Sequence, residues 1–201
     1  MIDFTATGLF TLAAIGLLGS PGPAIAALLA VGKAHGVAHG LRFYFGLQIG
    51  LATAAAISAV GFVSLLAAVP AIRIGMLIVA TIYLLYLAWK IGTAPVSDGT
   101  NTVRPPGGGF VLAGAALGVT NPKAYVAFAS LMATHVLVTG SAFNDGVFKW
   151  LIVVLVMIVV DIIWLMAGVA LGRARLPAKA ERALNIVLAV MIVAAALLAF
   201  A

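Results

Sequence analysis

The chain has 201 residues, of which 65% are hydrophobic and only 8% are charged, and its mean hydropathy is +1.26. A soluble domain carries about 25% charged residues, because a surface in water must be polar. This composition excludes a soluble enzyme, a nucleic-acid-binding domain and a disordered segment, and it predicts an all-α membrane protein.

Six apolar stretches are each long enough to cross a bilayer core of about 30 Å, which takes about 20 residues. They cover residues 4–31, 41–67, 74–91, 110–138, 147–171 and 184–200. We therefore predict one transmembrane domain over residues 1–201, with six helices in contact with lipid. Cysteine is absent, which excludes disulfides and thiolate metal sites. The N-terminus lacks the basic region of a cleaved signal peptide, so the first stretch is expected to remain as a span.

Basic residues are distributed unequally between the two sets of connections. One set contains Lys33, Arg42, Lys90, Arg104, Arg173, Arg175, Lys179 and Arg182. The other contains only Arg73 and Lys149, and Lys123 lies inside a predicted span. The positive-inside rule places the larger set in the cytoplasm. Both termini are then expected on the outer side, which is the periplasm in a Gram-negative cell.

A loop-like linker over residues 93–109 divides the chain almost at its midpoint. It would join two halves, of about residues 1–96 and 107–201, on the cytoplasmic side. A shift of 101 residues places Pro21 on Pro122 and Gly8 on Gly109. Because each half holds an odd number of spans, the two halves would enter the membrane from opposite sides. This pattern predicts two inverted three-helix repeats.

Two proline motifs interrupt the first and fourth predicted spans. They read Gly19-Ser20-Pro21-Gly22-Pro23 and Thr120-Asn121-Pro122-Lys123. Proline has no amide hydrogen and a fixed φ, so neither helix can continue undisturbed. Each motif lies about 15–16 Å from a span end at about 1.5 Å per residue, which predicts breaks near the midplane. Paired breaks in two halves indicate a transporter's binding site, whereas the first motif alone is equally consistent with a structural kink.

A broken helix offers N–H groups to a carboxylate and carbonyl groups to an ammonium ion, so this chemistry suits a small zwitterion such as an amino acid. The expected substrate contacts are Ser20, Pro21, Gly22, Pro23, Gln48, Asn121, Pro122, Lys123 and Tyr125. For Gln48 a hydrogen bond between helices is an equal alternative. For Tyr125 the alternative is packing.

Asp161 is the only acid inside a predicted span, and Lys123 is the other intramembrane charge. Such charges are costly in lipid and should face the interior of the helix bundle. One hypothesis is that Asp161 carries a coupling proton, and the alternative is a static Lys123–Asp161 pair that joins two helices. His35 and His39 have no acid nearby in sequence, so no metal site is expected. No catalytic residue is expected either.

Three of the glycine pairs that lie four residues apart fall within a predicted span or at its end, where such spacing allows close approach of two helices. The pairs are Gly46 and Gly50, Gly114 and Gly118, and Gly168 and Gly172. They fit packing within one chain as well as they fit a homodimer.

The two motifs, their spacing, the six spans and the glycine series after the first motif resemble the lysine exporter (LysE/RhtB) family over essentially the whole chain. The glycines of that series are Gly32, Gly36, Gly40, Gly46 and Gly50. The resemblance implies a multi-pass bacterial inner-membrane protein, without a cofactor, that exports amino acids or related small metabolites by proton antiport. Many members have an Asp directly after Pro-Gly-Pro. This chain has Ala24 there, so an acid that would contact a cationic group is missing.

Two other functions are considered. An exporter of inorganic ions from a related superfamily branch would need several acids or sulfur ligands within the spans, and these are not seen. An intramembrane aspartic protease would need a second acid facing Asp161. No nucleotide-binding loop of the Walker type is present, which excludes transport driven by ATP within this chain.

Overall fold

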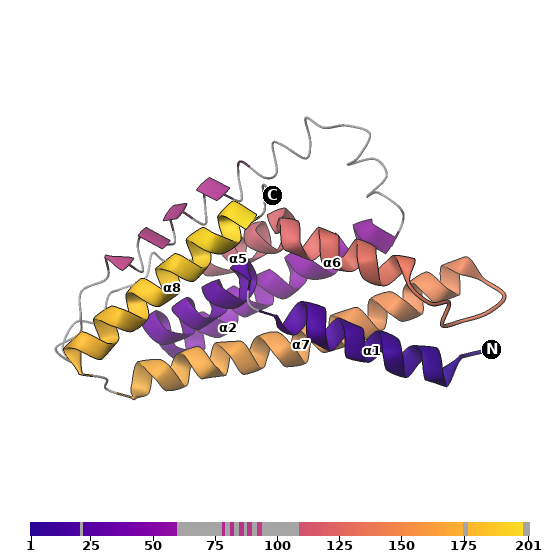
Figure 1. The fold of residues 1–201 in the computed structure, drawn as a ribbon, viewed down its shortest axis with the longest axis horizontal. Helices are drawn as coiled ribbons and strands as arrows, with labels where there is room; N and C mark the ends of the chain where they lie inside the picture. The colour runs from indigo at the N-terminus through magenta and orange to yellow at the C-terminus, as the bar shows by residue number, and fades with distance from the viewer. Residues whose placement is uncertain are drawn as a thin grey trace.

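The computed structural model describes residues 1–20, 22–59, 109–174 and 177–198, with some positions between residues 78 and 93. These residues form six helices and no strand, which confirms the all-α prediction for this part of the chain. The helices are α1 (Phe4–Gly19), α2 (Pro23–Ala59), α5 (Gly109–Thr120), α6 (Pro122–Ala133), α7 (Ala142–Arg173) and α8 (Ala178–Leu198) (Figure 1). Most of the predicted span 74–91, residues 60–67 of the second span and most of the linker 93–109 lie outside the described residues.

Local sequence explains where several helices begin. The Asp3 carboxylate accepts a hydrogen bond from the Ala6 amide at 3.0 Å and caps α1. At α7 the Ser141 hydroxyl accepts one from the Asn144 amide at 3.3 Å. Both residues are preferred helix N-caps because they satisfy an amide that has no partner within the helix. Helix α6 begins at Pro122, whose missing N–H costs nothing at the first helical position.

Helix α2 consists of two helical arms that meet at Gly36. This glycine has φ +68° and ψ −166°, a backbone conformation that an L side chain disfavours. In the first arm, Leu29 packs against Gly168 of α7, and Lys33 packs against Gly172 one turn further on. Both chains advance together along this contact, so the first arm runs parallel to α7.

The second arm of α2 contacts α7 in the opposite order. The Tyr44 hydroxyl donates to the Ile158 carbonyl at 3.0 Å, and the Trp150 indole N–H donates to the Ala52 carbonyl at 3.0 Å. Residue numbers rise along one helix as they fall along the other, so this arm is antiparallel to α7. The chain therefore reverses direction at Gly36, inside the connection that the sequence predicts between the first two spans.

The second arm of α2 also packs closely on α5. A Cβ at Gly46 would overlap the Val111 carbonyl, and a Cβ at Gly50 would overlap the Ala115 carbonyl. Gly114 is equally tight, against the Phe43 carbonyl. These contacts keep the same order along both helices, so the second arm and α5 are parallel. The glycine pairs, including Gly168 and Gly172 against the first arm, thus pack helices within one chain.

Polarity in this fold is the reverse of that in a soluble protein. Large apolar side chains point outward, with Leu12 68% exposed and Leu155 61% exposed. Asp161, Lys149 and Asn121 are instead buried, each with 4% exposure. An apolar exterior with polar groups inside is the arrangement that lipid requires, because an ionised side chain is costly against hydrocarbon. By length and apolar composition, α2 and α7 pass the test for membrane-spanning helices.

Candidate functional site

The first proline motif separates α1 from α2. Helix α1 ends at Gly19, Ser20 is extended with φ −72° and ψ 142°, and α2 begins at Pro23. The Ser20 hydroxyl donates to the Leu17 carbonyl at 2.8 Å, which gives a partner to one of the carbonyls at the helix end. Pro21 lies outside the described residues.

The second motif separates α5 from α6. Helix α5 ends at Thr120, whose hydroxyl donates back to the Ala116 carbonyl at 2.7 Å. Asn121 follows with an extended backbone, and α6 begins at Pro122. The Asn121 side chain is buried and makes no capping hydrogen bond, and its Oδ1 has no hydrogen-bond partner among the described residues.

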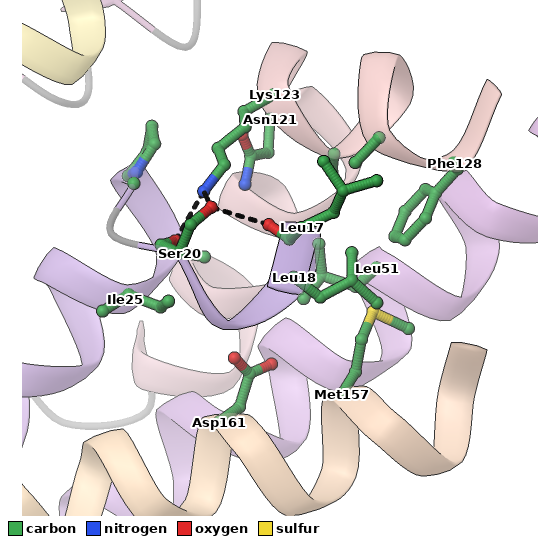
Figure 2. A pocket seen from close by; sticks show the side chains of 15 residues that line it. Leu17, Leu18, Ser20, Ile25, Leu51, Asn121, Lys123, Phe128, Met157 and Asp161 are labelled. Carbon is green, nitrogen blue, oxygen red and sulfur yellow. Dashed lines mark hydrogen bonds between the residues drawn. The ribbon is translucent and has the colours of Figure 1, made fainter. Parts of the chain in front are cut away.

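The two interruptions meet inside the protein. The Lys123 ammonium donates to the Ser20 carbonyl at 2.5 Å and to the Ser20 hydroxyl at 2.8 Å (Figure 2). The lysine side chain lies against Gly22, where an added Cβ would be only 2.7 Å from Lys123 Cδ. Residues more than one hundred positions apart in the sequence thus form one polar contact between the breaks.

Asp161 enters the same region from α7. The Gln48 side-chain amide donates to Asp161 Oδ2 at 2.7 Å, and to the Met157 carbonyl at a longer 3.4 Å. Gln48 therefore makes the hydrogen bond between helices that the sequence offered as its alternative role. Lys123 contacts Ser20 rather than Asp161, and no Lys123–Asp161 ion pair is found among the described residues. The structure therefore does not have the static pair that the sequence suggested as an alternative.

A cavity of about 40 Å³ lies where these residues converge. Figure 2 shows Lys123, Asn121 and Ser20 grouped on one side, with Asp161 on the other. The lining comprises Leu17, Leu18, Ser20, Gly22, Pro23, Ala24, Ile25, Leu51, Asn121, Lys123, Ala124, Ala127, Phe128, Met157 and Asp161. One water needs about 10–15 Å³ measured in this way, so the cavity has room for a few waters. An amino acid would need the walls to move apart.

Most of the predicted contact residues come together in this cavity. Ser20, Gly22, Pro23, Asn121, Lys123 and Asp161 all line it, and Gln48 is bonded to one of them. Pro122 and Tyr125 are not among the lining residues; Tyr125 is buried in the core cluster, as its packing alternative implied.

Sequence reasoning did not find the apolar wall formed by Leu17, Leu51, Phe128 and Met157. In a chain that is 65% hydrophobic, no local signal distinguishes an apolar residue of a cavity from one of the core.

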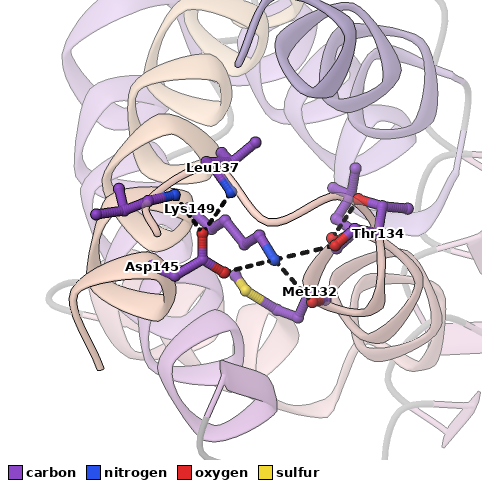
Figure 3. A network of polar contacts seen from close by, with 7 residues as sticks. Met132, Thr134, Leu137, Asp145 and Lys149 are labelled. Atoms are coloured by element: carbon purple, nitrogen blue, oxygen red, sulfur yellow. Dashed lines mark hydrogen bonds and ion pairs between the residues drawn. The ribbon is translucent and has the colours of Figure 1, made fainter. Parts of the chain in front are cut away.

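A second polar network, also missed, lies near the start of α7 (Figure 3). Asp145 Oδ1 accepts the amides of Leu137 at 2.6 Å and Val138 at 2.9 Å. Asp145 Oδ2 forms an ion pair with Lys149 at 2.8 Å. Lys149 also donates to the carbonyls of Met132 and Thr134, at 3.2 and 3.1 Å. This network ties the end of α6 and the following loop to α7.

The assignment of Lys149 to an outer connection needs correction, because the residue is buried inside α7. Its spacing of four residues from Asp145 was the available signal, since residues at that distance share one helix face. Hydropathy alone cannot tell a loop lysine from one buried with a partner near a helix end.

Comparison with known proteins gives an independent result. The LysE type translocator family model matches residues 15–201. Cysteine/O-acetylserine efflux proteins of Salmonella paratyphi A, Salmonella typhi and Salmonella typhimurium are each 30% identical over 174 residues, which is 87% of this chain and 87% of theirs. No solved structure matches the chain. Because the family match spans nearly all of the chain, as the two proline motifs predicted, the protein belongs to the LysE type translocator family.

Proposed function

We propose that this protein exports amino acids or related small metabolites across the bacterial inner membrane in exchange for protons. The observation on which the proposal rests is the cavity at the meeting point of the two helix interruptions, with Lys123 and Asp161 on different walls. Membership of a translocator family favours transport over an enzymatic reaction. The names of the Salmonella relatives point to cysteine and O-acetylserine as the first substrates to test.

The charges in the cavity suit a zwitterion. A substrate carboxylate would pair with the Lys123 ammonium, and a substrate ammonium would pair with Asp161. Ser20 and Asn121 add a hydroxyl and an amide beside Lys123. Asp161 is buried and Lys123 is partly buried, so a ligand of opposite charge would interact more strongly with them than in bulk water.

Transport would proceed by alternating access between two inverted repeats, whose breaks lie near the bilayer midplane. Helix order supports the repeats: the first arm of α2 is parallel to α7, and the second arm is parallel to α5. At the level of whole spans, exchanging the two halves turns the pairing of the first span with the fifth into that of the fourth span with the second, with the directions that an inverted repeat requires. The two segments in contact differ, because α5 precedes the break in its span and the first arm of α2 follows the break in its own. Lys33 packs beside Gly172, next to Arg173, so these basic residues share one end, which we assign to the cytoplasm. Both termini would then lie on the periplasmic side.

Asp161 is the proposed coupling acid. Its carboxylate lines the cavity and is oriented by Gln48. A proton and a substrate ammonium would compete for the same carboxylate, so binding of one from one side would favour release of the other. That competition is a sufficient basis for antiport, because the substrate ammonium binds the ionised Asp161 and does not bind the protonated one.

The test uses purified protein in proteoliposomes with an imposed pH gradient. Labelled cysteine, O-acetylserine, serine and a divalent metal salt are offered in separate arms. We expect gradient-driven accumulation of at least one amino acid by the wild-type protein. Asp161→Asn should abolish that accumulation and keep exchange of labelled for unlabelled substrate. Asp3→Asn is the matched control, because it removes an exposed acid and keeps a good N-cap.

Each arm has an outcome that contradicts the proposal. Unaltered accumulation in Asp161→Asn would remove the coupling role from that residue. Movement of the metal with no movement of any amino acid would replace the proposed substrate class.

A further inference from the structure

The end of α1 provides a small site for a cation. The Ser20 carbonyl and hydroxyl both face the Lys123 ammonium, and the hydroxyl itself is bonded to the Leu17 carbonyl. These oxygens lie at the C-terminal end of a helix, where the helix dipole also favours positive charge. We call the Ser20 carbonyl and hydroxyl, with the Leu17 carbonyl behind them, the oxygen cradle.

We propose that Lys123 is a tethered cation that fills the oxygen cradle when the carrier is empty. On binding, the ammonium group of the substrate takes the place of Lys123 on the Ser20 oxygens while it pairs with Asp161 across the small cavity, and the freed Lys123 pairs with the carboxylate of the same substrate. This inference rests on the proposed function, and it assigns to one residue the step that lets an empty carrier change conformation.

The position of Lys123 in the fold supports this role. It is the second residue of α6, at the positive end of that helix, where a cation is disfavoured. Its side chain extends away from its own helix and across Gly22 to the negative end of α1. A Cβ at position 22 would obstruct this path, at 2.7 Å from Lys123 Cδ and 3.0 Å from Nζ. Gly22 of the first motif therefore leaves the space through which Lys123 of the second motif reaches the oxygen cradle.

The cavity is too small for an amino acid while Lys123 lies in the oxygen cradle. With Lys123 in the oxygen cradle, only about 40 Å³ remains. Without a cation there, the Ser20 carbonyl and hydroxyl would lose two charge-assisted hydrogen bonds, which are about twice as strong as neutral ones. Return of the empty carrier thus depends on Lys123, whereas return of the loaded carrier does not.

The experiment compares net export with exchange in the same proteoliposomes. Net export requires the empty carrier to return, whereas exchange uses the loaded carrier in both directions. Exchange is measured with saturating substrate on both sides, so that a weaker affinity does not lower its rate. Lys123→Met removes the tethered cation, Gly22→Ala keeps every charge but obstructs the lysine, and Lys179→Met is the matched control because this lysine is exposed on α8.

We expect Lys123→Met to reduce net export about 10–100-fold, the ratio that corresponds to losing a hydrogen bond to a charged group. Exchange should fall by a smaller factor, because Lys123 also pairs with the substrate carboxylate, so the ratio of the two losses is the quantity that tests the inference. Gly22→Ala should give the same split in the same direction, and Lys179→Met should change neither rate. Size-exclusion profiles establish that each variant is folded.

The inference is overturned if either folded variant loses net export and exchange by the same factor, or loses neither. Gly22→Ala keeps the inference testable if Lys123→Met does not fold. Failure of the wild-type protein to exchange any amino acid would instead reject the proposed function, and this inference with it.

Discussion

Two aspartate–lysine combinations lie inside the helix bundle, with all but the partly buried Lys123 fully buried, and they are arranged differently. Near the start of α7, Asp145 and Lys149 are in direct contact at 2.8 Å, and backbone groups take up their other bonds (Figure 3). At the helix breaks, Lys123 and Asp161 lie across a cavity and are held by the neutral partners Ser20 and Gln48 (Figure 2).

The difference separates a structural network from a site that can change partners. In a buried pair in contact, each charge is already neutralised by the other. Separating the two residues leaves a buried charge without a partner, which is costly. No ion pair joins Lys123 and Asp161 in the described part of the chain, so each could bind a substrate group of opposite sign by exchanging hydrogen bonds with neutral groups. We therefore propose that the separated charges, rather than the paired ones, belong to the transport site.

The largest effect on stability is expected from Lys149→Met, which leaves the Asp145 carboxylate without its cation. We expect the free energy of unfolding in detergent to fall by about 3–5 kcal/mol, as for other buried pairs that lose one partner. The double variant Asp145→Asn/Lys149→Met should lose less than the single variant, because its buried residues are neutral. Thermal denaturation of both proteins measures this, and an equal loss would mean that charge burial is not the cause.

A smaller effect, on affinity, is expected from Asn121→Ala. Its Oδ1 has no partner among the described residues, and its side chain does not cap α6. Stability should therefore change by less than about 1 kcal/mol, below the cost of orphaning a bonded buried group. Substrate affinity should fall about tenfold, or about 1.4 kcal/mol. Denaturation together with the substrate dependence of exchange checks both parts, and a stability loss as large as that of Lys149→Met would remove the contrast between the regions.

The smallest effect is expected from Trp150→Phe, beside Lys149 in the sequence. The Trp150 indole N–H donates to the Ala52 carbonyl at 3.0 Å, a single neutral bond between α7 and α2. Such bonds between membrane helices contribute about 0.6 kcal/mol on average. Denaturation in detergent should show a loss of that order with normal exchange. A loss above about 2 kcal/mol would show that neutral contacts stabilise this end as much as the ion pair does.

Many features of the fold follow from local chemistry and were predicted from it. Proline cannot donate a helical hydrogen bond, so α1 and α5 end beside Pro21 and Pro122. The sequence predicted a connection between residues 31 and 41, and the structure places its turn at Gly36, which tolerates a positive φ. Asp161 was expected to face the interior of the helix bundle, because an acid is costly against lipid, and it is buried there.

The partners of the charged residues could not be predicted in the same way. The sequence does not show whether Lys123 contacts Ser20 or Asp161; in the structure its side chain lies against Gly22 and its ammonium donates to Ser20. For Lys149, the apolar residues that follow it in the sequence are compatible with a position in a loop and with a position in α7 paired with Asp145. The sequence therefore does not show which of the two is correct.

The sequence by itself determined that this is a membrane protein, which family it belongs to, where α1 and α5 end, and how few charges its apolar stretches contain. All of these depend on composition or on the backbone chemistry of single residues. The tertiary structure decided that the two breaks meet, that Lys123 contacts Ser20 while Asp161 contacts Gln48, and that the glycine pairs pack one chain on itself. Those outcomes depend on the distances between helices that are far apart in the sequence. Packing of the whole chain sets these distances, and no local sequence pattern indicates them.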